Sequence, residues 1–419
     1  MTENTQPVLL VLGAGDEAYR SFALAEFAAQ HRLVLIDNEP SAWAALHVAE
    51  QVIVDLHDRQ ATELAIKEIA THHTVAGITT YLETHVELAA HLAAALQLPG
   101  ADPAAVTACR DKARTRQLLA EHRVPSARSY TVTSEADAIA TAQAVGYPVV
   151  VKPRGMAGSS GVRRADSPED VIAHYRAATT VTLMGLEING AAGVLVEEYL
   201  DGPEISAECV VTGPGDIHIV AITRKSLSAE PAFLETAHLV DARDPLLTDA
   251  SVRTVVNSAV NAVGINRGVL HVELRLTARG ARIIEINARM GGDLIPRLVQ
   301  LATGIRLPQI SAALATGAEP DLTVTRQQSA AIEFHYPKAT GRLDAVHSDI
   351  SGHWVERQVW THQTGDHVRS GTDATIGDRL GHLVVTGPTP ASCSARLRQA
   401  EQHLHIRIAT PAYVTACVR

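Results

Sequence analysis

Continuous apolar runs alternate with helical patterns over the first hundred residues. The runs are Pro7–Gly15, Arg32–Asp37, Gln51–Val54 and Val75–Thr80, and the helical patterns are Ala61–Ala70 and Val86–Leu96. A run that is apolar throughout indicates a strand buried on both faces, as in a parallel sheet that helices cover. The alternation is typical of βαβ units. The pattern therefore predicts an open α/β, Rossmann-like domain over residues 1–106.

A charged helical segment follows this domain and leads into a smaller unit. We expect a helix to begin after Asp102-Pro103, to continue through Arg110–Arg116 and to end at Val124-Pro125. From Tyr130 to Glu198 the pattern is strand, helix, strand, glycine loop, helix and strand. This order predicts a small α+β unit.

Longer strand patterns occupy the rest of the chain. Strands are expected at Glu204–Val211, His218–Thr223, Val269–Leu276 and Arg282–Asn287, and a helical tract at Leu294–Ala315. From Gln327 onward the pattern consists of short strands, Gly-rich turns and one helix at Ala391–His403. We therefore predict a central domain over residues 107–325 and a separate α+β module over residues 326–419.

Composition and charge exclude several classes of protein. A chain of 419 residues exceeds the usual size of one hydrophobic core, so several subdomains are expected. The net charge is −10 and the basic residues are scattered, which argues against a nucleic-acid partner. No apolar run approaches the roughly 18–20 residues that cross a bilayer, and the polar N-terminus does not predict a signal peptide. Four separated cysteines favour a reducing, cytoplasmic location.

The glycines after the first strand are a candidate dinucleotide site. Gly13-Ala14-Gly15 lacks the third glycine of the dinucleotide fingerprint, although Asp37 stands where an acid would bind ribose. A tight turn between a buried strand and a helix explains the same residues. The pattern favours the turn.

A second glycine-rich loop follows a lysine that closes a strand. Lys152 precedes the segment Gly155–Gly161, which also contains Ser159 and Ser160. Backbone N–H groups and hydroxyls in such a loop can bind phosphate oxygens. The segment is not a P-loop, because no Gly-Lys-Ser/Thr follows the glycines. A plain flexible hairpin is the alternative.

The strongest constellation is a predicted hairpin that carries acidic residues. Glu285, Asn287 and Arg289 alternate along one strand and so share a face. If Ala278-Arg279-Gly280 is a three-residue loop, Glu273 falls directly opposite Glu285. Opposed carboxylates are destabilising unless a cation lies between them, and oxygen ligands alone suit Mg²⁺ or Mn²⁺.

The alternative is an exposed hairpin face on which two arginines neutralise the carboxylates. Arg275 and Arg289 would then be the counter-ions. That alternative requires no metal. The sequence favours the metal site, with Glu273, Glu285 and Asn287 as ligands.

The order of these motifs over about Thr107–Ala315 resembles the ATP-grasp superfamily. The resemblance implies an ATP-grasp fold of α/β and α+β parts, with the N-terminal domain before it and residues 130–198 as a lid. It also implies several nucleotide contacts. They are Lys112 and Lys152 on the phosphates, Gly155, Ser159, Ser160 and Gly161 in the closing loop, Glu197 through its side chain and Glu198 and Leu200 through their backbones on adenine, and Glu204 on the ribose.

Within this superfamily, Arg289 resembles the arginine near the transferring phosphate and the substrate carboxylate. A guanidinium suits both groups, and Arg289 and Lys152 are the expected catalytic residues. The stretch Ala288–Pro296 resembles that of L-amino acid ligases, which form dipeptides. Lys225, His271 and Arg297 are further pocket candidates. The implied reaction consumes ATP, a small-molecule carboxylate and an amine, and the family analogy includes a homodimer.

Three alternatives remain open. A carboxylase of the same superfamily would use bicarbonate, although the chain has no Ala-Met-Lys-Met biotin acceptor. An NAD-dependent oxidoreductase would rest on the N-terminal glycine turn. A nucleotide-binding protein without catalysis conflicts with the intact set Glu273, Glu285, Asn287 and Arg289.

Overall fold

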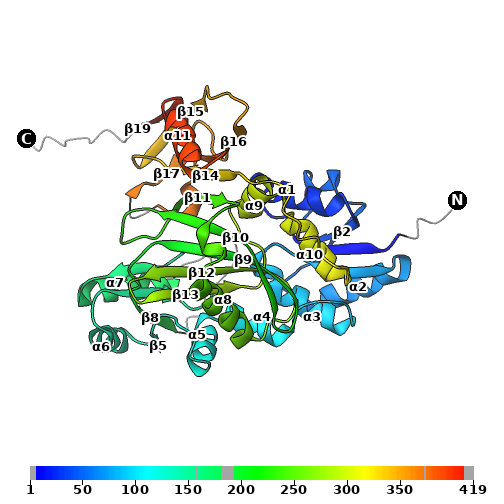
Figure 1. Cartoon of the computed structure of the whole chain (residues 1–419), viewed down its shortest axis with the longest axis horizontal. Helices are drawn as coiled ribbons and strands as arrows, with labels where there is room; N and C mark the ends of the chain where they lie inside the picture. The colour runs from blue at the N-terminus through cyan, green and yellow to red at the C-terminus, as the bar shows by residue number, and fades with distance from the viewer. Residues whose placement is uncertain (1–5, 157, 181–192, 372–373, 410–419) are drawn as a thin grey trace, which may run out of the picture.

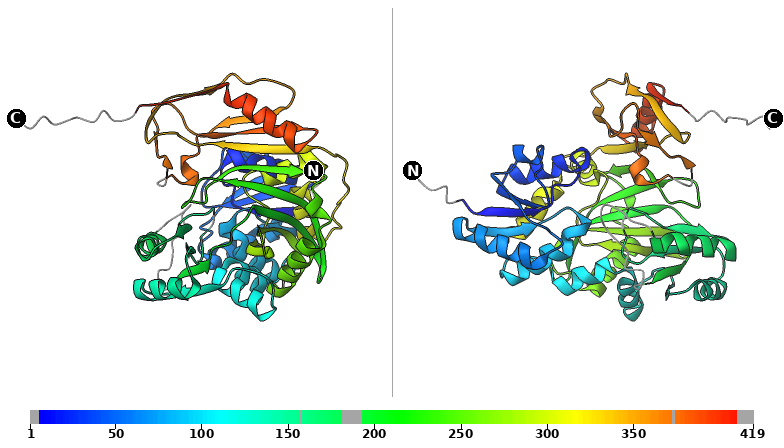
Figure 2. Two further views of the ribbon diagram at one scale, coloured as in Figure 1. Left: turned by 60° about the vertical axis from the view of Figure 1, so that its left-hand side comes forward. Right: turned by 180° about the vertical axis from the view of Figure 1, so that it is seen from behind.

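The computed structural model describes residues 6–156, 158–180, 193–371 and 374–409. Figure 1 shows a large central sheet with the N-terminal unit, in blue and cyan, on one side of it. The C-terminal segment, in orange and red, lies above the sheet, and a small unit around α6 and α7 lies at its lower left. The two views in Figure 2 show the same arrangement from the side and from behind.

The N-terminal unit is a parallel sheet covered by helices, as its apolar runs predict. The strands lie in the order β3-β2-β1-β4, and every residue of the first strand is buried. Its elements are β1 (Val8–Leu12), α1 (Glu17–Ala28), β2 (Arg32–Asp37), η1 (Ala44–Leu46), β3 (Glu50–Ile53), α2 (Arg59–His72), β4 (Val75–Thr79), η2 (Glu83–His85) and α3 (Val86–Ala95).

Asp111 separates two helices where the sequence pattern predicts one. α4 (Pro103–Arg110) ends at Asp111, and α5 (Lys112–Glu121) begins after it. Asp111 Oδ1 accepts from the backbone N–H groups of Ala113 at 3.0 Å and Arg114 at 3.3 Å. The expectation of one continuous helix is therefore wrong, because this carboxylate caps a new helix instead of continuing the old one.

The small α+β unit has the predicted order of elements and one additional short strand. Its antiparallel sheet has the order β5-β8-β6-β7. The elements are β5 (Ser129–Val132), α6 (Glu135–Val145), β6 (Val149–Pro153), β7 (Arg163–Ala165), α7 (Pro168–Thr180) and β8 (Val194–Glu198). The glycine loop lies between β6 and β7, so its neighbour Lys152 is held in a strand.

The central sheet has eight strands in the order β13-β12-β9-β10-β11-β14-β18-β16. Its first part comprises β9 (Glu204–Gly213), β10 (Asp216–Leu227), β11 (Glu235–Asp241), η4 (Pro245–Leu247), α8 (Ala250–Val263), β12 (Gly268–Thr277) and β13 (Gly280–Asn287). The predicted tract Leu294–Ala315 is two helices, α9 (Ile295–Thr303) and α10 (Leu307–Thr316). Gly304, with φ of 85°, follows α9 and ends it.

Two of the longer elements of this domain, β11 and α8, are absent from the sequence expectations. β11 is seven residues long and has only three apolar residues, Ala237, Leu239 and Val240, without regular alternation, so its hydrophobic signal is weak. α8 is a regular amphipathic helix, with Asp249 as its N-cap and Gly264 as its left-handed C-cap. The sequence therefore contains the signals of this helix.

The C-terminal segment from residue 326 onward contributes strands to the central sheet. β14 (Ser329–His335) pairs with β11 and β18 (Gly381–Gly387), and β16 (Val355–Trp360) pairs with β18. The remaining elements are β15 (Gly341–Ser348), β17 (His367–Val368), η6 (Ile376–Asp378), α11 (Pro390–Glu401) and β19 (Leu404–Ala409). β17, β15 and β19 form a separate three-stranded sheet. The domain boundary at 325/326 stays a prediction, and hydrogen-bonded strands cross it.

The main core joins the N-terminal unit to the central sheet. Leu24 and Phe27 of α1 belong to the same buried cluster as Leu298 of α9 and Ile310 of α10. Gly77 of β4 lies so close to α10 that a Cβ would meet the Ala315 carbonyl oxygen at 2.2 Å. These contacts fix the carboxyl end of β4 beside the central domain. Among the described residues, no helix has the length and apolarity needed to cross a membrane.

Candidate active site

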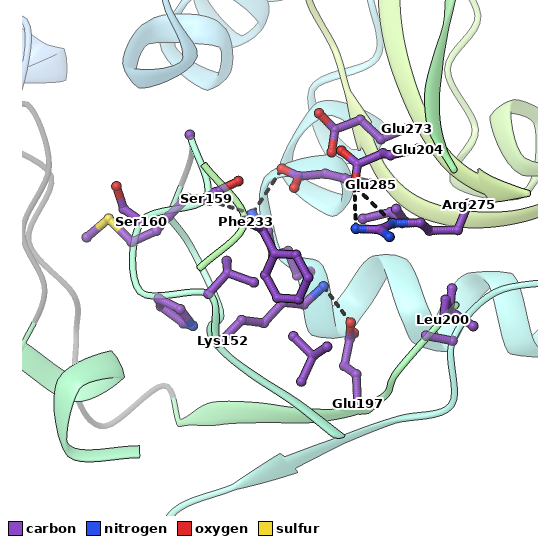
Figure 3. Close-up of a pocket in the computed structure, with 18 of the residues that line it drawn as sticks. Lys152, Ser159, Ser160, Glu197, Leu200, Glu204, Phe233, Glu273, Arg275 and Glu285 are labelled. Atoms are coloured by element: carbon purple, nitrogen blue, oxygen red, sulfur yellow. Dashed lines mark hydrogen bonds and ion pairs between the residues drawn. The ribbon is translucent and has the colours of Figure 1, made fainter. Parts of the chain in front are cut away.

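A large cavity lies between the small α+β unit and the central sheet. Figure 3 shows Glu204, Glu273 and Glu285 on one side of it and Lys152, Ser159 and Ser160 on the other. Twelve of the residues predicted to bind nucleotide, to bind metal or to act in catalysis line it. They are Lys112, Lys152, Ser159, Ser160, Glu197, Glu198, Leu200, Glu204, Glu273, Glu285, Asn287 and Arg289. The structure therefore brings together motifs that are up to 177 positions apart, since Lys112 and Arg289 both line this cavity.

Two of the predicted nucleotide contacts are not part of the cavity wall. Gly155 and Gly161 lie in the loop, but the wall is formed by their neighbours Met156, Gly158 and Val162. The Gly155 carbonyl accepts from Arg110 Nη2 at 3.3 Å, and Gly161 has φ of 74°. These glycines shape the loop, and Ala157, within it, lies outside the described residues.

Two cations surround one buried carboxylate at the end of the cavity nearest β6 and β8. Glu197 Oε2 lies 2.6 Å from Lys152 Nζ, and Glu197 also accepts from Arg116 Nε at 2.8 Å and Nη2 at 3.1 Å. Burial raises the pKa of Glu197, but Arg116 and Lys152 more than offset this and lower it to about 2. Burial also lowers the pKa of Lys152 below its ordinary value, with Glu197 opposing the shift. This end carries an excess of positive charge.

This geometry differs from the expected role of Glu197 as a side-chain contact to adenine. Its carboxylate is fully engaged with Arg116 and Lys152, so it holds the two cations in place instead of pointing freely into the cavity. Arg116 is missing from the sequence-based set. The signal is its position four residues after Lys112, on the same buried face of α5.

The hairpin confirms the predicted opposition of Glu273 and Glu285, although its turn differs from the expected one. Thr277 pairs with Gly280, not with Ala281, and this register alone would place Glu273 opposite Ile284. A bulge between Glu273 and Leu274 adds one residue to β13 and restores the pairing of Glu273 with Glu285. Gly280 has the expected left-handed conformation, with φ of 93°.

Each of the opposed carboxylates contacts its own lysine. Glu273 Oε1 lies 2.6 Å from Lys225 Nζ, and Glu285 Oε1 lies 2.9 Å from Lys112 Nζ. Burial raises the pKa of Glu273, but Lys225 and His271 bring it well below its ordinary value. The arginines considered as counter-ions in the sequence have other partners.

Those other partners explain what the arginines do. Arg275 Nη2 lies 3.1 Å from Glu204 Oε2, and its Nη1 donates to the Gly202 carbonyl at 2.9 Å. Arg289 Nε pairs with Glu83. The hairpin face is therefore half-buried and neutralised from several elements, and the alternative of an exposed face with local counter-ions is wrong.

A group of three carboxylates surrounds Lys225. Its Nζ lies 2.5 Å from Glu235 Oε1 and 3.6 Å from Glu204 Oε1, in addition to Glu273. Burial lowers the pKa of Lys225, but these carboxylates raise it well above the ordinary value. Glu235 belongs to β11, the strand that the sequence pattern did not reveal. This end of the cavity carries an excess of negative charge.

Glu83, from the N-terminal unit, completes the site. Arg110 Nη1 donates to Glu83 Oε1 at 2.7 Å, and Arg289 pairs with the other carboxylate oxygen. Burial raises the pKa of Glu83, but Arg289 and Arg110 lower it to about 2. Glu83 follows the buried strand β4, where α/β sheets commonly place functional residues. That position is the signal that could have identified it.

Oxygen atoms converge at Asn287. Its amide lies 3.2 Å from Glu285 Oε1 and 3.3 Å from Glu83 Oε2, and its nitrogen donates to both in one orientation of the group. In the other orientation, the amide oxygen faces the two carboxylates. The carboxylate oxygens of Glu273 and Glu285 and the amide oxygen of Asn287 are donors that Mg²⁺ or Mn²⁺ accepts, so the predicted ligands fit the expected metal.

Of the two remaining pocket candidates, His271 contacts a residue of the cavity wall and Arg297 lies away from the cavity. His271 is buried between Glu208, with Nδ1 at 3.0 Å, and Glu273, with Nε2 at 3.1 Å, so it supports a wall residue. Arg297 does not line the cavity, because it pairs with Glu356 of β16 and donates to Gln300 at 2.6 Å. Its place in the pocket is therefore not supported.

The glycine turn of the N-terminal unit has a structural explanation. Asp37 Oδ2 accepts from the Ala14 backbone N–H at 2.8 Å. A Cβ at Gly13 would lie 2.5 Å from Leu82 Cδ1. The acid considered for ribose binding thus caps the turn, and the turn packs tightly against the segment after β4.

The chain has the ATP-grasp fold, and the comparison with protein families agrees. The ATP-grasp domain family matches residues 145–297. The family L-amino acid ligase C-terminal domain 2 matches residues 333–409. The chain thus combines the ATP-grasp domain with the C-terminal domain of L-amino acid ligases, which confirms the predicted resemblance.

Individual relatives extend this comparison. The structure of an L-amino acid ligase from Bacillus licheniformis matches with a TM-score of 0.81 and 21% identity, over 97% of this chain and all of the other. A biotin carboxylase from Campylobacter jejuni matches with a TM-score of 0.69 and 17% identity, over 96% and 92%. Carnosine synthase 1 of Homo sapiens is 26% identical over 82% of this chain, which spans only 42% of that relative. At these identities the structures show the fold, and the matched tail favours the ligase class over the carboxylases.

Proposed function

We propose that this protein is an ATP-dependent ligase that activates the carboxylate of an amino acid as an acyl phosphate and joins it to an amine. The observation that carries the proposal is the pairing, in one cavity, of a cation-rich end with an end rich in oxygen ligands. Such a cavity suits a nucleotide polyphosphate at one end and a divalent cation at the other.

The nucleotide would lie along the wall formed by the small α+β unit. Lys152 and Lys112 would contact the phosphates, and Ser159 and Ser160 would close over them. The backbones of Glu198 and Leu200 would contact adenine, and Glu204 the ribose hydroxyls. Arg116 would act through Glu197, by fixing the position of Lys152.

A divalent metal ion, Mg²⁺ or Mn²⁺, would be held by Glu273, Glu285 and Asn287. When bound, it would neutralise charge on the phosphates that react. Lys225 and Lys112, which contact the same carboxylates here, hold them in place through ion pairs.

Arg289 is the proposed catalytic arginine. Its partner Glu83 and its hydrogen bond from Nη1 to the Met290 carbonyl, at 2.8 Å, fix its orientation in the cavity wall. In the first step, a substrate carboxylate oxygen attacks the γ-phosphorus, the bond to the bridging oxygen breaks and ADP leaves. Arg289 would stabilise the negative charge on the transferring group.

In the second step, the amine nitrogen attacks the acyl carbon of the intermediate. The bond from that carbon to the phosphate-bearing oxygen breaks, phosphate leaves with this oxygen, and the amine loses a proton to solvent. The protein needs no nucleophile of its own. Its contribution is positioning, charge stabilisation and protection of the acyl phosphate from water.

The carboxylase alternative shares the fold and the nucleotide end of the cavity. It differs in the acceptor, and the matched C-terminal domain 2 of L-amino acid ligases argues for the ligase. The dinucleotide alternative is weaker, because Asp37 caps its own turn. A homodimer remains a prediction by analogy, and a cytoplasmic location remains a prediction from the separated cysteines.

The test is phosphate release from ATP with Mg²⁺ and mixtures of amino acids, followed by mass spectrometry of the products. We expect release that depends on the amine, together with a condensed amide. The matched control is Arg289→Lys, which keeps the charge but not the guanidinium fork. Wild-type phosphate release without any amide product would overturn the ligase proposal.

A further inference from the structure

Two histidines stack on the outer face of the small C-terminal sheet. His347 of β15 lies directly opposite His405 of β19 in the antiparallel register. Their ring centroids are 4.7 Å apart and their planes differ by 17°. Both side chains are exposed, so they are accessible from solvent.

A carboxylate lies beside this pair. Asp349 follows β15, and its Oδ2 lies 3.4 Å from His405 Nε2. Its backbone N–H donates to the His403 carbonyl at 3.3 Å, which ties the segment after β15 to the start of β19. One potential ligand atom from each of His347, Asp349 and His405 lies within 4.8 Å of the other two.

The separations suit a transition-metal ion. Imidazole nitrogens and carboxylate oxygens bind Zn²⁺ at about 2.0–2.2 Å, so two ligands of a tetrahedral ion are roughly 3.3–3.6 Å apart. The 3.4 Å between His405 Nε2 and Asp349 Oδ2 lies within this range of ligand–ligand distances. Rotation of the His347 side chain would complete the set, and an exposed side chain can change rotamer at little cost.

We propose that His347, Asp349 and His405 form a surface site for a borderline-soft divalent ion of the Zn²⁺, Cu²⁺ or Ni²⁺ class. Two imidazoles and one carboxylate favour these ions over Mg²⁺, which prefers oxygen ligands. Water takes the remaining position. The site is chemically distinct from the oxygen-only set in the cavity.

The ion would link two strands that are far apart in the sequence. β19 is an edge strand of its sheet and is paired only with β15 among the described strands. An ion bound to both strands binds the folded module and not the unfolded chain, so it stabilises the fold. We therefore infer that the ion fastens the C-terminal strand to the module.

The test is a zinc titration of the full-length protein without a polyhistidine tag, after chelation, by calorimetry. His347→Gln and Asp349→Asn are the variants, and His353→Gln, another exposed histidine of this module, is the matched control. Thermal unfolding without metal shows whether each variant folds as the wild type does.

We expect one zinc ion per chain at this site and an unfolding temperature that rises with zinc. His347→Gln should weaken binding by about tenfold or more, Asp349→Asn by less, and His353→Gln should leave it unchanged. If wild type and His347→Gln bind zinc equally, or if neither binds it, the proposed site is wrong. Zinc that binds without raising the unfolding temperature would overturn the fastening of β19.

Discussion

The two ends of the cavity differ in the sign of their excess charge. Near β6 and β8, Lys152 and Arg116 surround the single carboxylate of Glu197. On the central sheet, a group of carboxylates surrounds Lys225 instead, and these are Glu204, Glu235 and Glu273. A buried excess of either sign is costly unless something of opposite sign is bound. The comparison indicates that one end is completed by an anion and the other by a cation.

The largest expected effect comes from the carboxylate end. Glu285→Gln keeps the shape of the side chain but removes the charge, so the proposed metal loses a ligand. We expect turnover to fall by more than about 100-fold, with little change in unfolding temperature. Steady-state assays beside Glu319→Gln, an exposed acid, provide the control. Wild-type turnover in Glu285→Gln would show that the metal site lies elsewhere.

Lys225→Met tests the excess of negative charge on the central sheet by its effect on the free energy of unfolding. The substitution leaves three carboxylates with less positive charge, and we expect a loss of about 3 kcal/mol in unfolding free energy. Mg²⁺ should recover more stability in this variant than in the wild type, because it replaces the lost cation. Urea unfolding with and without Mg²⁺ measures both effects, with Lys67→Met as the exposed control. An unchanged midpoint without Mg²⁺ would contradict the account.

Lys152→Ala tests the positive excess. It removes a charge-assisted contact to phosphate, so ATP should bind about 10- to 100-fold more weakly. The same variant leaves Glu197 paired with Arg116, which limits the effect on folding. Equilibrium binding of ATP, compared with Lys67→Ala, gives the measurement. Equal affinities in the two variants would remove Lys152 from the phosphate site.

The smallest expected effect concerns stability in acid. A buried histidine of the central sheet and the ion pairs of the cavity should respond in different pH ranges. His382 is fully buried, its nitrogens have no partner among the described residues, and burial lowers its pKa to about 4. Protonation therefore opposes folding between about pH 6.5 and pH 4, at roughly 1.4 kcal/mol per pH unit. Glu83 and Glu197, with pKa near 2, lose their contribution only below about pH 4.5.

Acidification from pH 7 to pH 5 should thus lower the free energy of unfolding through His382 and leave the ion pairs of the cavity intact. We expect His382→Leu to lose less stability over this interval than the wild type does. Denaturant unfolding at the two pH values measures the difference. The same pH dependence in both proteins would show that His382 is not responsible.

The sequence predicts strands and motifs well where the signal is local. Glu285, Asn287 and Arg289 were found because alternation along one strand is visible in the chain itself. The opposition of Glu273 and Glu285 was predicted with a longer turn, and a bulge, which the sequence does not reveal, corrects the register.

Partners that come from distant elements were not predictable in the same way. Arg116 meets Glu197 across 81 positions, and Glu83 meets Arg289 across two domains. Such pairs depend on how the domains pack, which local patterns do not encode. The expected adenine contact of Glu197 differs from its observed pairing with Arg116 and Lys152 for this reason, because the fold brings these cations to it.

The most direct measurement follows an oxygen atom through the proposed reaction. The amino acid substrate, labelled with ¹⁸O in its carboxylate, is incubated with the enzyme, ATP, Mg²⁺ and the amine, and the released phosphate is examined by mass spectrometry. If an acyl phosphate forms, one carboxylate oxygen is transferred to phosphate, so labelled phosphate should appear in proportion to the amide. Amide formation with unlabelled phosphate, or with the label in AMP, would contradict the central claim.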